Sequence, residues 1–186
     1  MNTKEEIIEK IEEPMGDDEI KKYLPDVKIM TNKDLNKYND IDEILDKRKY
    51  VDMIVLLFLD SPNSGHWVLL SKYGNFIEFF DSYGNSPDVV FNFVPKEIRK
   101  QLGTEKNKLG ELLNKSKYNI IYNPVKYQAE NNEKFDVNTC GRHICNRAIH
   151  LKGKGYILPE YYEMMKCAKE HFKEPYDIIV SKLINM

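Results

Sequence analysis

Residues 138–150 read NTCGRHICNRAIH, and this stretch organises the fold that we predict. Asn138 and Thr139 are residue types that commonly precede the first turn of a helix. Apolar side chains then recur at helical spacing until Gly153, a residue type that often ends helices. The pattern predicts a largely buried helix that begins at or beside Cys140.

Cys140 is a candidate nucleophile because of its place at this predicted helix start. A thiol there lies at the positive end of the helix dipole, which favours the thiolate over the thiol. The next residue, Gly141, carries no side chain, so a substrate backbone can approach the sulfur closely. The same pattern also fits a structural cysteine, because free cysteine is among the most buried residue types.

Length and composition fit one globular domain, which we assign to residues 1–186. Apolar residues make up 41% of the chain and charged residues 31%, as in proteins with a core and a hydrated surface. The longest apolar run, Met53–Leu59, is too short to span a bilayer, and the N-terminus lacks the apolar segment of a signal peptide. Three cysteines without paired spacing argue against a disulfide framework. We therefore expect a protein that is neither secreted nor inserted in a membrane.

The N-terminal part of the chain differs in charge from the rest. Residues 1–46 hold fourteen acidic and seven basic side chains, a net charge of −7, whereas residues 47–186 have a net charge of +5. We predict an acidic helical N-terminal segment whose charges form a solvated surface. Its helical patterns cover 3–13, Asp18–Tyr23, Lys33–Tyr38 and Asp40–Leu45.

Strand patterns occupy the middle of the chain, and helical patterns lie before and after them. Runs of apolar residues bounded by turn-forming residues predict four strands. This order gives an α+β arrangement. The predicted strands are Asp52–Asp60, His66–Ser71, Phe76–Phe80 and Tyr118–Tyr122. The later predicted helices are Val89–Leu102 with Pro95 as a break or start, Thr104–Asn114, Pro159–Phe172 and Tyr176–Asn185.

His66 and Asp81 are candidates for a general base and the acid that orients it. A thiolate that attacks a carbonyl needs both, together with donors for the oxyanion. His66 begins one predicted strand, Asp81 follows the next, and the linker 72–75 suits a hairpin turn. A hairpin brings the start of one strand beside the end of the other, so we expect the two side chains to meet. Taken singly, His66 also fits a surface histidine, and Asp81 fits a turn-forming residue.

Gln128 is a candidate oxyanion donor. Its side-chain amide can donate to an oxyanion that lies beside the backbone N–H of Cys140. Gln128 directly precedes the polar loop 129–139. By composition alone it is an ordinary polar loop residue.

Four short motifs, taken together, resemble the adenain-type cysteine proteases. They are GHW at 65–67, FDSYG at 80–84, Gln128, and TCG at 139–141. This group includes the adenovirus maturation protease, related proteases of large DNA viruses, virophages and Maverick-type transposons, and the SUMO-processing proteases. The match covers roughly residues 51–151, and the compact size and the FDSYG turn are most similar to the virophage and Maverick branch.

The resemblance implies a role for each motif. Cys140 would be the nucleophile, and His66 the general base that later protonates the leaving amine. Asp81 would fix the tautomer of His66, while Gln128 and the backbone N–H of Cys140 would form the oxyanion hole. The implied fold is a central mixed β-sheet flanked by helices, with the nucleophile at the N-terminus of a buried central helix, as in papain-like and adenain-like proteins. The residues that would line the substrate path are Gly65, Trp67 and Gly141.

The position of Gln128 departs from the adenovirus enzyme. Gln128 lies twelve residues before Cys140, and the spacing in that enzyme is shorter. Other amide side chains in the same region therefore stay open as oxyanion donors. These alternatives are Asn123, Asn131, Asn132 and Asn138.

The function implied by the resemblance is that of a cysteine endopeptidase. Its substrate would be a viral capsid protein or another structural precursor, cleaved during particle maturation, often after small residues. We expect a monomer without a cofactor, located in the virion or inside the infected cell, in the host cytoplasm or viral factory. Residues 51–151 would form the catalytic core, and residues 158–186 the C-terminal helices. The same residues also fit a peptidase that processes ubiquitin-like proteins, an acetyltransferase on the same fold, or an inactive binding module.

Two further patterns have competing interpretations. Cys140, His143, Cys145 and His150 suggest zinc, but only the first two share a helix face and no second ligand pair has the usual spacing, so we predict no metal. We expect Cys145 and Cys167 to be core thiols. Residues 96–117 hold seven basic and three acidic side chains, and we favour a solvated helical surface over a nucleic-acid face.

Overall fold

The computed structural model describes residues 4–131 and 136–184 of the chain, which divides into two compact units. Unit 1 comprises Met1–Asp26 and Val125–Met186, and unit 2 comprises Val27–Pro124. Unit 2 is thus one continuous stretch of chain, and unit 1 combines the N-terminal and C-terminal segments. The predicted α+β class with a mixed sheet is confirmed.

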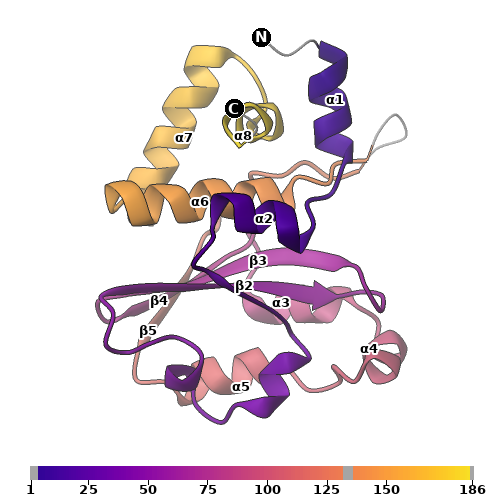
Figure 1. The fold of residues 1–186 in the computed structure, drawn as a ribbon, viewed down its shortest axis with the longest axis vertical. Coiled ribbons are helices and arrows are strands. Elements are labelled where there is room, and N and C mark those ends of the chain that lie inside the picture. The colour runs from indigo at the N-terminus through magenta and orange to yellow at the C-terminus, as the bar shows by residue number, and fades with distance from the viewer. Residues whose placement is uncertain (1–3, 132–135, 185–186) are drawn as a thin grey trace. The chain divides into compact units, whose positions relative to one another are not determined.

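A five-stranded sheet forms the framework of unit 2, in the spatial order β1-β2-β3-β4-β5 (Figure 1). The three central strands pair antiparallel, while β1 runs parallel to β2 and β5 runs parallel to β4. The strands are β1 (Lys28–Thr31), β2 (Val51–Leu59), β3 (Gly65–Tyr73), β4 (Phe76–Phe80) and β5 (Asn119–Tyr122). Four of them correspond to the predicted strands. The analysis of the sequence missed β1, which has only four residues.

The hairpin between β3 and β4 has the tight turn that the sequence predicted. Tyr73 pairs with Phe76, so only Gly74 and Asn75 lie in the turn. Gly74 has a φ of 54°, which glycine adopts without the steric cost that a side chain would bring. Because the turn is so short, it fixes the register of the two strands along their whole length.

Three α-helices and two 3₁₀ helices complete unit 2. Figure 1 shows α4 and α5 below the sheet, and α5 buries Leu109, Leu112 and Leu113 in the same core as Ile77 and Phe79 of β4. Pro95 is confirmed as a break, because it separates α3 from α4. The elements are η1 (Asp34–Lys37), η2 (Ile41–Glu43), α3 (Pro87–Phe93), α4 (Lys96–Leu102) and α5 (Lys108–Lys115).

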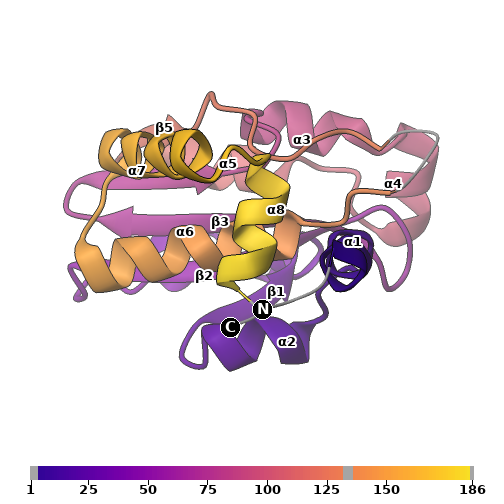
Figure 2. The ribbon, with the colours of Figure 1, turned by 90° about the horizontal axis from the view of Figure 1, so that it is seen from above.

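The regular secondary structure of unit 1 is all helical among its described residues, and irregular segments join the helices. Its longest helices are α6 (Cys140–Lys154) and α7 (Leu158–Phe172), and α8 (Tyr176–Leu183) contacts both of them. Figure 2 shows α8 crossing α6. The N-terminal helices α1 (Lys4–Glu12) and α2 (Asp17–Tyr23) contact α8 and α6 respectively. Residues 3 and 185 of the predicted helices lie outside the described residues.

The helix α6 begins at Cys140, as the sequence predicted, and its apolar face is buried. Ile144, Ala148 and Leu151 are all at most 2% exposed. The predicted end at Gly153 is wrong, because α6 continues to Lys154. Gly155 ends it in the left-handed conformation, with its N–H donating to the carbonyl of Leu151. No helix among residues 4–131 and 136–184 combines the length and the apolar character that crossing a bilayer would require.

Candidate active site

His66 and Asp81 meet at one end of the β3–β4 hairpin in unit 2. The strand register pairs Leu69 with Phe80. One further step along β4 brings Asp81 opposite Val68, whose neighbour on the same face of the sheet is His66. The distance from His66 Nε2 to Asp81 Oδ1 is 2.5 Å. The contact that the hairpin predicted is therefore present.

The main chain and the carboxylate of Asp81 are both held in place. Asn123 accepts a hydrogen bond from the N–H of Asp81 (3.0 Å) and donates one to its carbonyl oxygen (2.9 Å). Asn123 directly follows β5, and Asp81 directly follows β4. Because these two strands are parallel, both residues lie at the same end of the strands. The N–H of Asn85 donates to the second carboxylate oxygen, Oδ2, at 3.0 Å. Sequence analysis did not find this clamp on the Asp81 backbone.

These contacts keep Asp81 ionised and orient the imidazole. Burial alone would raise the pKa of this fully buried carboxyl, but the hydrogen bond and charge of His66 and the N–H groups of Asn85 and Tyr83 together hold the pKa below its usual range. An ionised carboxylate only accepts hydrogen bonds, so His66 Nε2 is the donor. In the neutral ring, Nδ1 is then the basic nitrogen. The His66 side chain is 20% exposed, so its ring is not enclosed in the core.

The neighbours of His66 are packed tightly. Its ring stacks on the ring of Tyr83, with centroids 5.2 Å apart and planes inclined by 29°. A Cβ on Gly65 would lie 2.0 Å from the carbonyl oxygen of Phe58 on β2, so the strand pairing itself requires glycine here. Trp67 is 5% exposed. Gly65 thus has a structural reason of its own, and the roles of Gly65 and Trp67 in substrate binding stay predictions.

Cys140, in unit 1, is the first residue of α6 and is 9% exposed. The first turn of α6 contains no acidic side chain. Arg142, two residues further on, is buried and interacts electrostatically with Cys140. It is anchored by donating from Nη1 to the carbonyl oxygen of Glu13 at 2.7 Å. A helix N-terminus and a fixed guanidinium both stabilise a thiolate.

The other two cysteines differ from Cys140 and from each other. Burial raises the pKa of the Cys145 thiol to about 12, although the Arg142 charge acts in the opposite direction. Cys145 is therefore a protonated core thiol at neutral pH, as expected. The prediction for Cys167 is wrong, because this residue is exposed on α7.

Gly141 has a packing role within unit 1. A Cβ at this position would lie 2.8 Å from the Cβ of Met15, in the segment between α1 and α2. Glycine therefore lets this segment pack against the first turn of α6. The close approach of a substrate to Gly141 stays a prediction.

Gln128, also in unit 1, is 2% exposed and has an anchored amide. Its Nε2 donates to the carbonyl oxygen of Val137 at 2.7 Å, which links the two ends of the loop before α6. Asn131 accepts from the N–H of Val137, and Asn138 donates to the carbonyl oxygen of Glu12. These two alternatives, like Asn123 in unit 2, hold backbone in place. Asn132 lies outside the described residues.

Asp177 is a buried acid that sequence analysis did not single out. It lies in the first turn of α8 and accepts hydrogen bonds from Thr139 Oγ1 (2.5 Å), from His143 Nε2 (3.1 Å) and from the N–H of Ala129 (3.0 Å). The only signal in the sequence is an acidic residue at a helix start, which is common. Among the described residues, no cluster of three or more His, Cys, Asp or Glu side chains is arranged to hold a metal ion.

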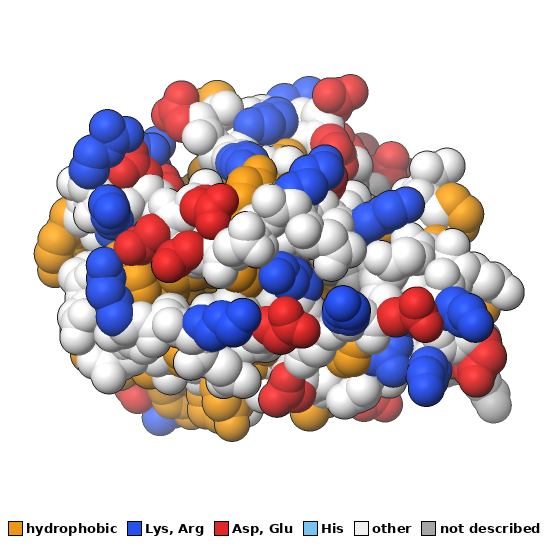
Figure 3. All heavy atoms as spheres, turned by 90° about the horizontal axis from the view of Figure 1, so that it is seen from below, with side chains coloured by type: hydrophobic (Ala, Val, Ile, Leu, Met, Phe, Trp, Pro, Cys, Tyr) orange, Lys and Arg blue, Asp and Glu red, His pale blue; other side chains and the backbone are white. Residues whose placement is uncertain are grey.

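The basic stretch 96–117 contributes to a surface of mixed charge. Figure 3 shows Lys and Arg side chains interspersed with Asp and Glu on the face it draws. Several basic residues of the stretch have partners within unit 2: Arg99 lies 3.9 Å from the ring centroid of Phe91, and Lys117 is 3.0 Å from Asp42. These contacts favour the solvated surface, and a nucleic-acid face stays a weakly supported alternative.

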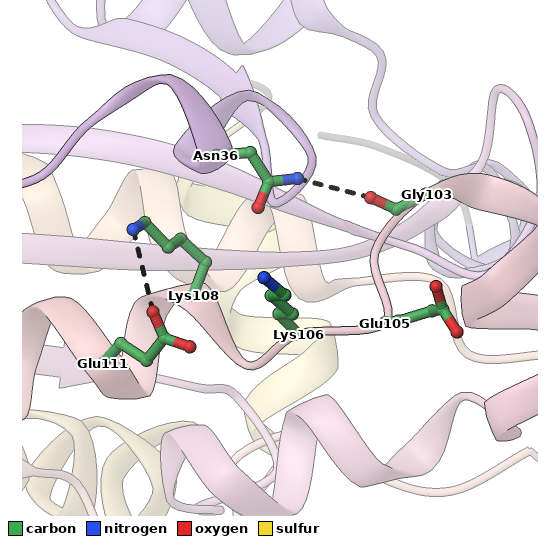
Figure 4. Close-up of a pocket in the computed structure, with 6 residues that line it drawn as sticks. All are labelled: Asn36, Gly103, Glu105, Lys106, Lys108 and Glu111. Atoms are coloured by element: carbon green, nitrogen blue, oxygen red, sulfur yellow. Dashed lines mark hydrogen bonds and ion pairs between the residues drawn. The ribbon is translucent and has the colours of Figure 1, made fainter.

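A hollow of about 380 Å³ lies beside this stretch (Figure 4). Figure 4 shows Asn36 donating to the carbonyl oxygen of Gly103, Lys108 facing Glu111 at 3.7 Å, and Lys106 between these two pairs. Two lysines and two glutamates line the hollow, so their charges balance. Its lining residues are Asn36, Gly103, Glu105, Lys106, Lys108 and Glu111, and none of them belongs to the predicted active site.

Comparison with known proteins gives a relationship without an activity. No protein-family model matches the chain. The chain is 37% identical over 132 residues to uncharacterized protein V9 of the Sputnik virophage, an alignment that covers 70% of this chain and 72% of V9.

Proposed function

The chain belongs to the same family as protein V9 of the Sputnik virophage, and on this premise we propose that it is a cysteine endopeptidase that processes a virion protein. The observation that carries the proposal is the His66–Asp81 pair, joined at 2.5 Å at the end of the β3–β4 hairpin, in a chain where the largely buried helix α6 starts with a cysteine. The virophage relationship agrees with the resemblance to the virophage branch of the adenain-type proteases. The proposal requires that the His66 ring reach the Cys140 sulfur in the active enzyme.

The first chemical step is acylation of the cysteine. The Cys140 thiolate attacks the carbonyl carbon of the scissile peptide bond, and the carbonyl oxygen takes the negative charge. The backbone N–H of Cys140 and the Gln128 amide stabilise that oxyanion. The imidazolium of His66 then gives its proton to the peptide nitrogen as the C–N bond breaks. The products are a free amine and a thioester on Cys140.

The second step releases the other product and restores the enzyme. His66 takes a proton from a water molecule, whose oxygen attacks the thioester carbonyl. The C–S bond breaks, the acid product leaves, and the thiolate–imidazolium pair re-forms. Asp81 stays ionised through both steps. It holds Nε2–H and therefore directs Nδ1 toward the reacting atoms.

The proposed substrate is a capsid protein or another structural precursor of a virus particle. This choice depends on the resemblance and on the virophage relative. The proposed cleavage in Gly-Gly or Gly-X sequences rests on the resemblance alone.

The direct test is to incubate the protein with candidate virion precursors and to map new termini by mass spectrometry. We expect defined cleavage that Cys140→Ala abolishes and that Cys167→Ala, at an exposed thiol, leaves unchanged. Cleavage by a folded Cys140→Ala protein would exclude this nucleophile. Acetyl transfer from acetyl-CoA without cleavage would favour the acetyltransferase, and an unreactive Cys140 would favour the binding module.

A cross-linking test examines the encounter of His66 with Cys140 without any substrate. The reagent 1,3-dibromoacetone has two carbon atoms that each carry a bromine. The thiolate displaces bromide from one of them, and a nearby imidazole can displace bromide from the other. We expect a Cys140–His66 cross-link in the wild-type protein and only singly alkylated Cys140 in His66→Gln. A cross-link from Cys140 to another residue, with none to His66, would overturn the proposed pairing.

A further inference from the structure

One buried carboxylate joins the two chain segments that carry the proposed oxyanion donors. Asp177, on α8, is 5% exposed. Its Oδ2 accepts from the N–H of Ala129, which directly follows Gln128. Its Oδ1 accepts from the hydroxyl of Thr139, which directly precedes Cys140. The carboxylate thus contacts the chain one residue beyond each donor.

The contact with Asp177 changes what Thr139 does at the start of α6. A threonine at the N-cap normally accepts a hydrogen bond from an N–H group of the first turn. The Thr139 side chain makes no such bond and donates to Asp177 instead. The N-cap side chain therefore does not compete for the first-turn N–H groups, which an oxyanion beside Cys140 would use.

Holding α8 in place does not require a charge. Ile179 and Val180 of the same helix are at most 2% exposed and supply apolar contact. A buried carboxylate costs free energy unless several donors satisfy it, and here Ala129, Thr139 and His143 do so. The bond from His143 Nε2, at 3.1 Å, fixes the orientation of the carboxylate. These donors come from two segments of the chain, namely Ala129 and the start of α6, and a simple packing contact would not need to join them.

We propose that Asp177 is a positioning residue, which sets the placement of the Gln128 amide relative to the N-terminus of α6 and so shapes the oxyanion hole. Asp177 itself does not touch the substrate. This inference rests on the proposed function, because it assigns Gln128 and Cys140 to the same transition state. Without Asp177, both segments keep their own local structure but lose the shared anchor that fixes their spacing.

Two reagents separate oxyanion stabilisation from thiolate formation. p-Nitrophenyl acetate acylates Cys140 through a tetrahedral oxyanion, forming the C–S bond and releasing p-nitrophenolate. Iodoacetamide alkylates the same thiolate by displacing iodide, and no oxyanion forms. The ratio of the two rates therefore reports the oxyanion hole alone. Mass spectrometry locates both modifications on Cys140, and circular dichroism checks that each variant folds.

We expect Asp177→Asn to slow acylation by about 10- to 100-fold, less than or equal to the loss of a whole oxyanion donor. Alkylation should stay within about threefold, because removing a negative charge near the helix start does not disfavour a thiolate. Thr139→Val, which loses the hydroxyl but keeps the size of the side chain, should slow acylation and leave alkylation unchanged. Thr139→Ser, which keeps the hydroxyl, should be acylated at about the wild-type rate. Glu174→Gln is the matched control, since Glu174 pairs with Lys182 of α8 at 2.6 Å.

The outcomes distinguish this inference from the proposed function. If the wild-type protein cleaves its substrate and Asp177→Asn leaves the acylation-to-alkylation ratio unchanged, positioning by Asp177 is wrong and the peptidase stands. If acylation and alkylation fall together, Asp177 has only a structural role. If no precursor is cleaved but acylation still depends on Asp177, the peptidase proposal fails and the positioning role stands. Should Asp177→Asn fail to fold, the two Thr139 variants decide the question.

Discussion

Two histidine–aspartate pairs among the described residues look alike in chemistry and differ in surroundings. In unit 2, His66 Nε2 lies 2.5 Å from Asp81, and the His66 side chain is 20% exposed. In unit 1, His143 Nε2 lies 3.1 Å from Asp177, and the His143 side chain is fully buried. A base must reach a thiol and a substrate, so the exposed ring favours His66 over His143 for the proposed base role.

The second ring nitrogen strengthens this contrast. His143 Nδ1 is buried and has no hydrogen-bond partner among the described residues. The hydrogen bond between Nε2 and Asp177 holds the ring in the core of unit 1. The lesson is that the residue pair alone does not define a catalytic dyad, and that access to the ring decides.

Glutamine substitutions at both histidines test the comparison most strongly. Gln keeps an Nε2 donor for the aspartate but cannot take a proton. We expect His66→Gln to lower kcat for precursor cleavage by about 10³-fold or more, since the general base is lost. His143→Gln, the matched control, should change kcat by less than about threefold. Equal losses at the two positions would break the distinction between them.

Removal of Asp81 should cost less than removal of the base. Asp81→Ala eliminates the group that orients His66 but leaves the imidazole, so we expect kcat to fall by about 10²- to 10³-fold. The pH dependence of kcat should change as well, because the imidazolium loses its adjacent carboxylate. Steady-state kinetics from pH 5 to 9 measures both effects. A loss larger than that of His66→Gln would contradict the assigned roles.

Gln128→Ala tests the proposed oxyanion donor in unit 1. Gln128 directly precedes Ala129, whose N–H donates to Asp177. We expect kcat to fall by about 10²-fold, with KM within a few fold, because the donor acts on the transition state. Asn131→Ala is the control, since it also removes a contact to Val137 within the same loop. If Gln128→Ala leaves kcat unchanged and Asn131→Ala lowers it, Asn131 rather than Gln128 is the oxyanion donor.

Local sequence patterns predicted the parts of the site that neighbouring residues determine. The hairpin turn of two residues fixed the register of β3 and β4, and the register alone brought Asp81 to His66. The start of α6 at Cys140 followed from N-cap residue types and apolar spacing. In both cases the signal lies within about fifteen residues of sequence, where steric and hydrogen-bonding preferences act directly.

Contacts between distant segments could not be predicted in the same way. Asn123 reaches Asp81 across 42 residues, and Asp177 reaches Thr139 across 38. Each is an ordinary polar residue beside a helix or strand end, and its partner depends on how the elements pack. The prediction of where α6 ends was wrong because glycine does not always end a helix. Gly153 can be accommodated inside α6, and the left-handed conformation at Gly155 ends the helix.

Both pairs should lose their contribution to the free energy of unfolding in acid. This is the smallest effect that we predict. Burial would raise the pKa of Asp177, but the contacts with His143, Thr139 and the N–H of Ala129 outweigh burial and hold this pKa below its usual range. The contacts of Asp81 lower the pKa of its carboxyl in the same way. A carboxyl with a lowered pKa in the folded state stabilises the fold above the pKa of the unfolded chain, about 4, and this contribution disappears as pH falls through the folded value. The free energy of unfolding of the wild-type protein should therefore be level from pH 7 to about 5 and fall below about pH 4.

Urea titrations at several pH values separate the two contributions. Asp177→Asn should lower the free energy of unfolding at pH 7, measured by circular dichroism, and the difference from wild type should narrow below about pH 4. Asp81→Asn should do the same, measured by the fluorescence of Trp67 in unit 2, the single tryptophan of the chain. A difference that widens on acidification would mean that the carboxyl is protonated in the folded protein at neutral pH. Such a carboxyl could neither orient His66 nor anchor the start of α6, so the acid response tests the shared electrostatic basis of both pairs.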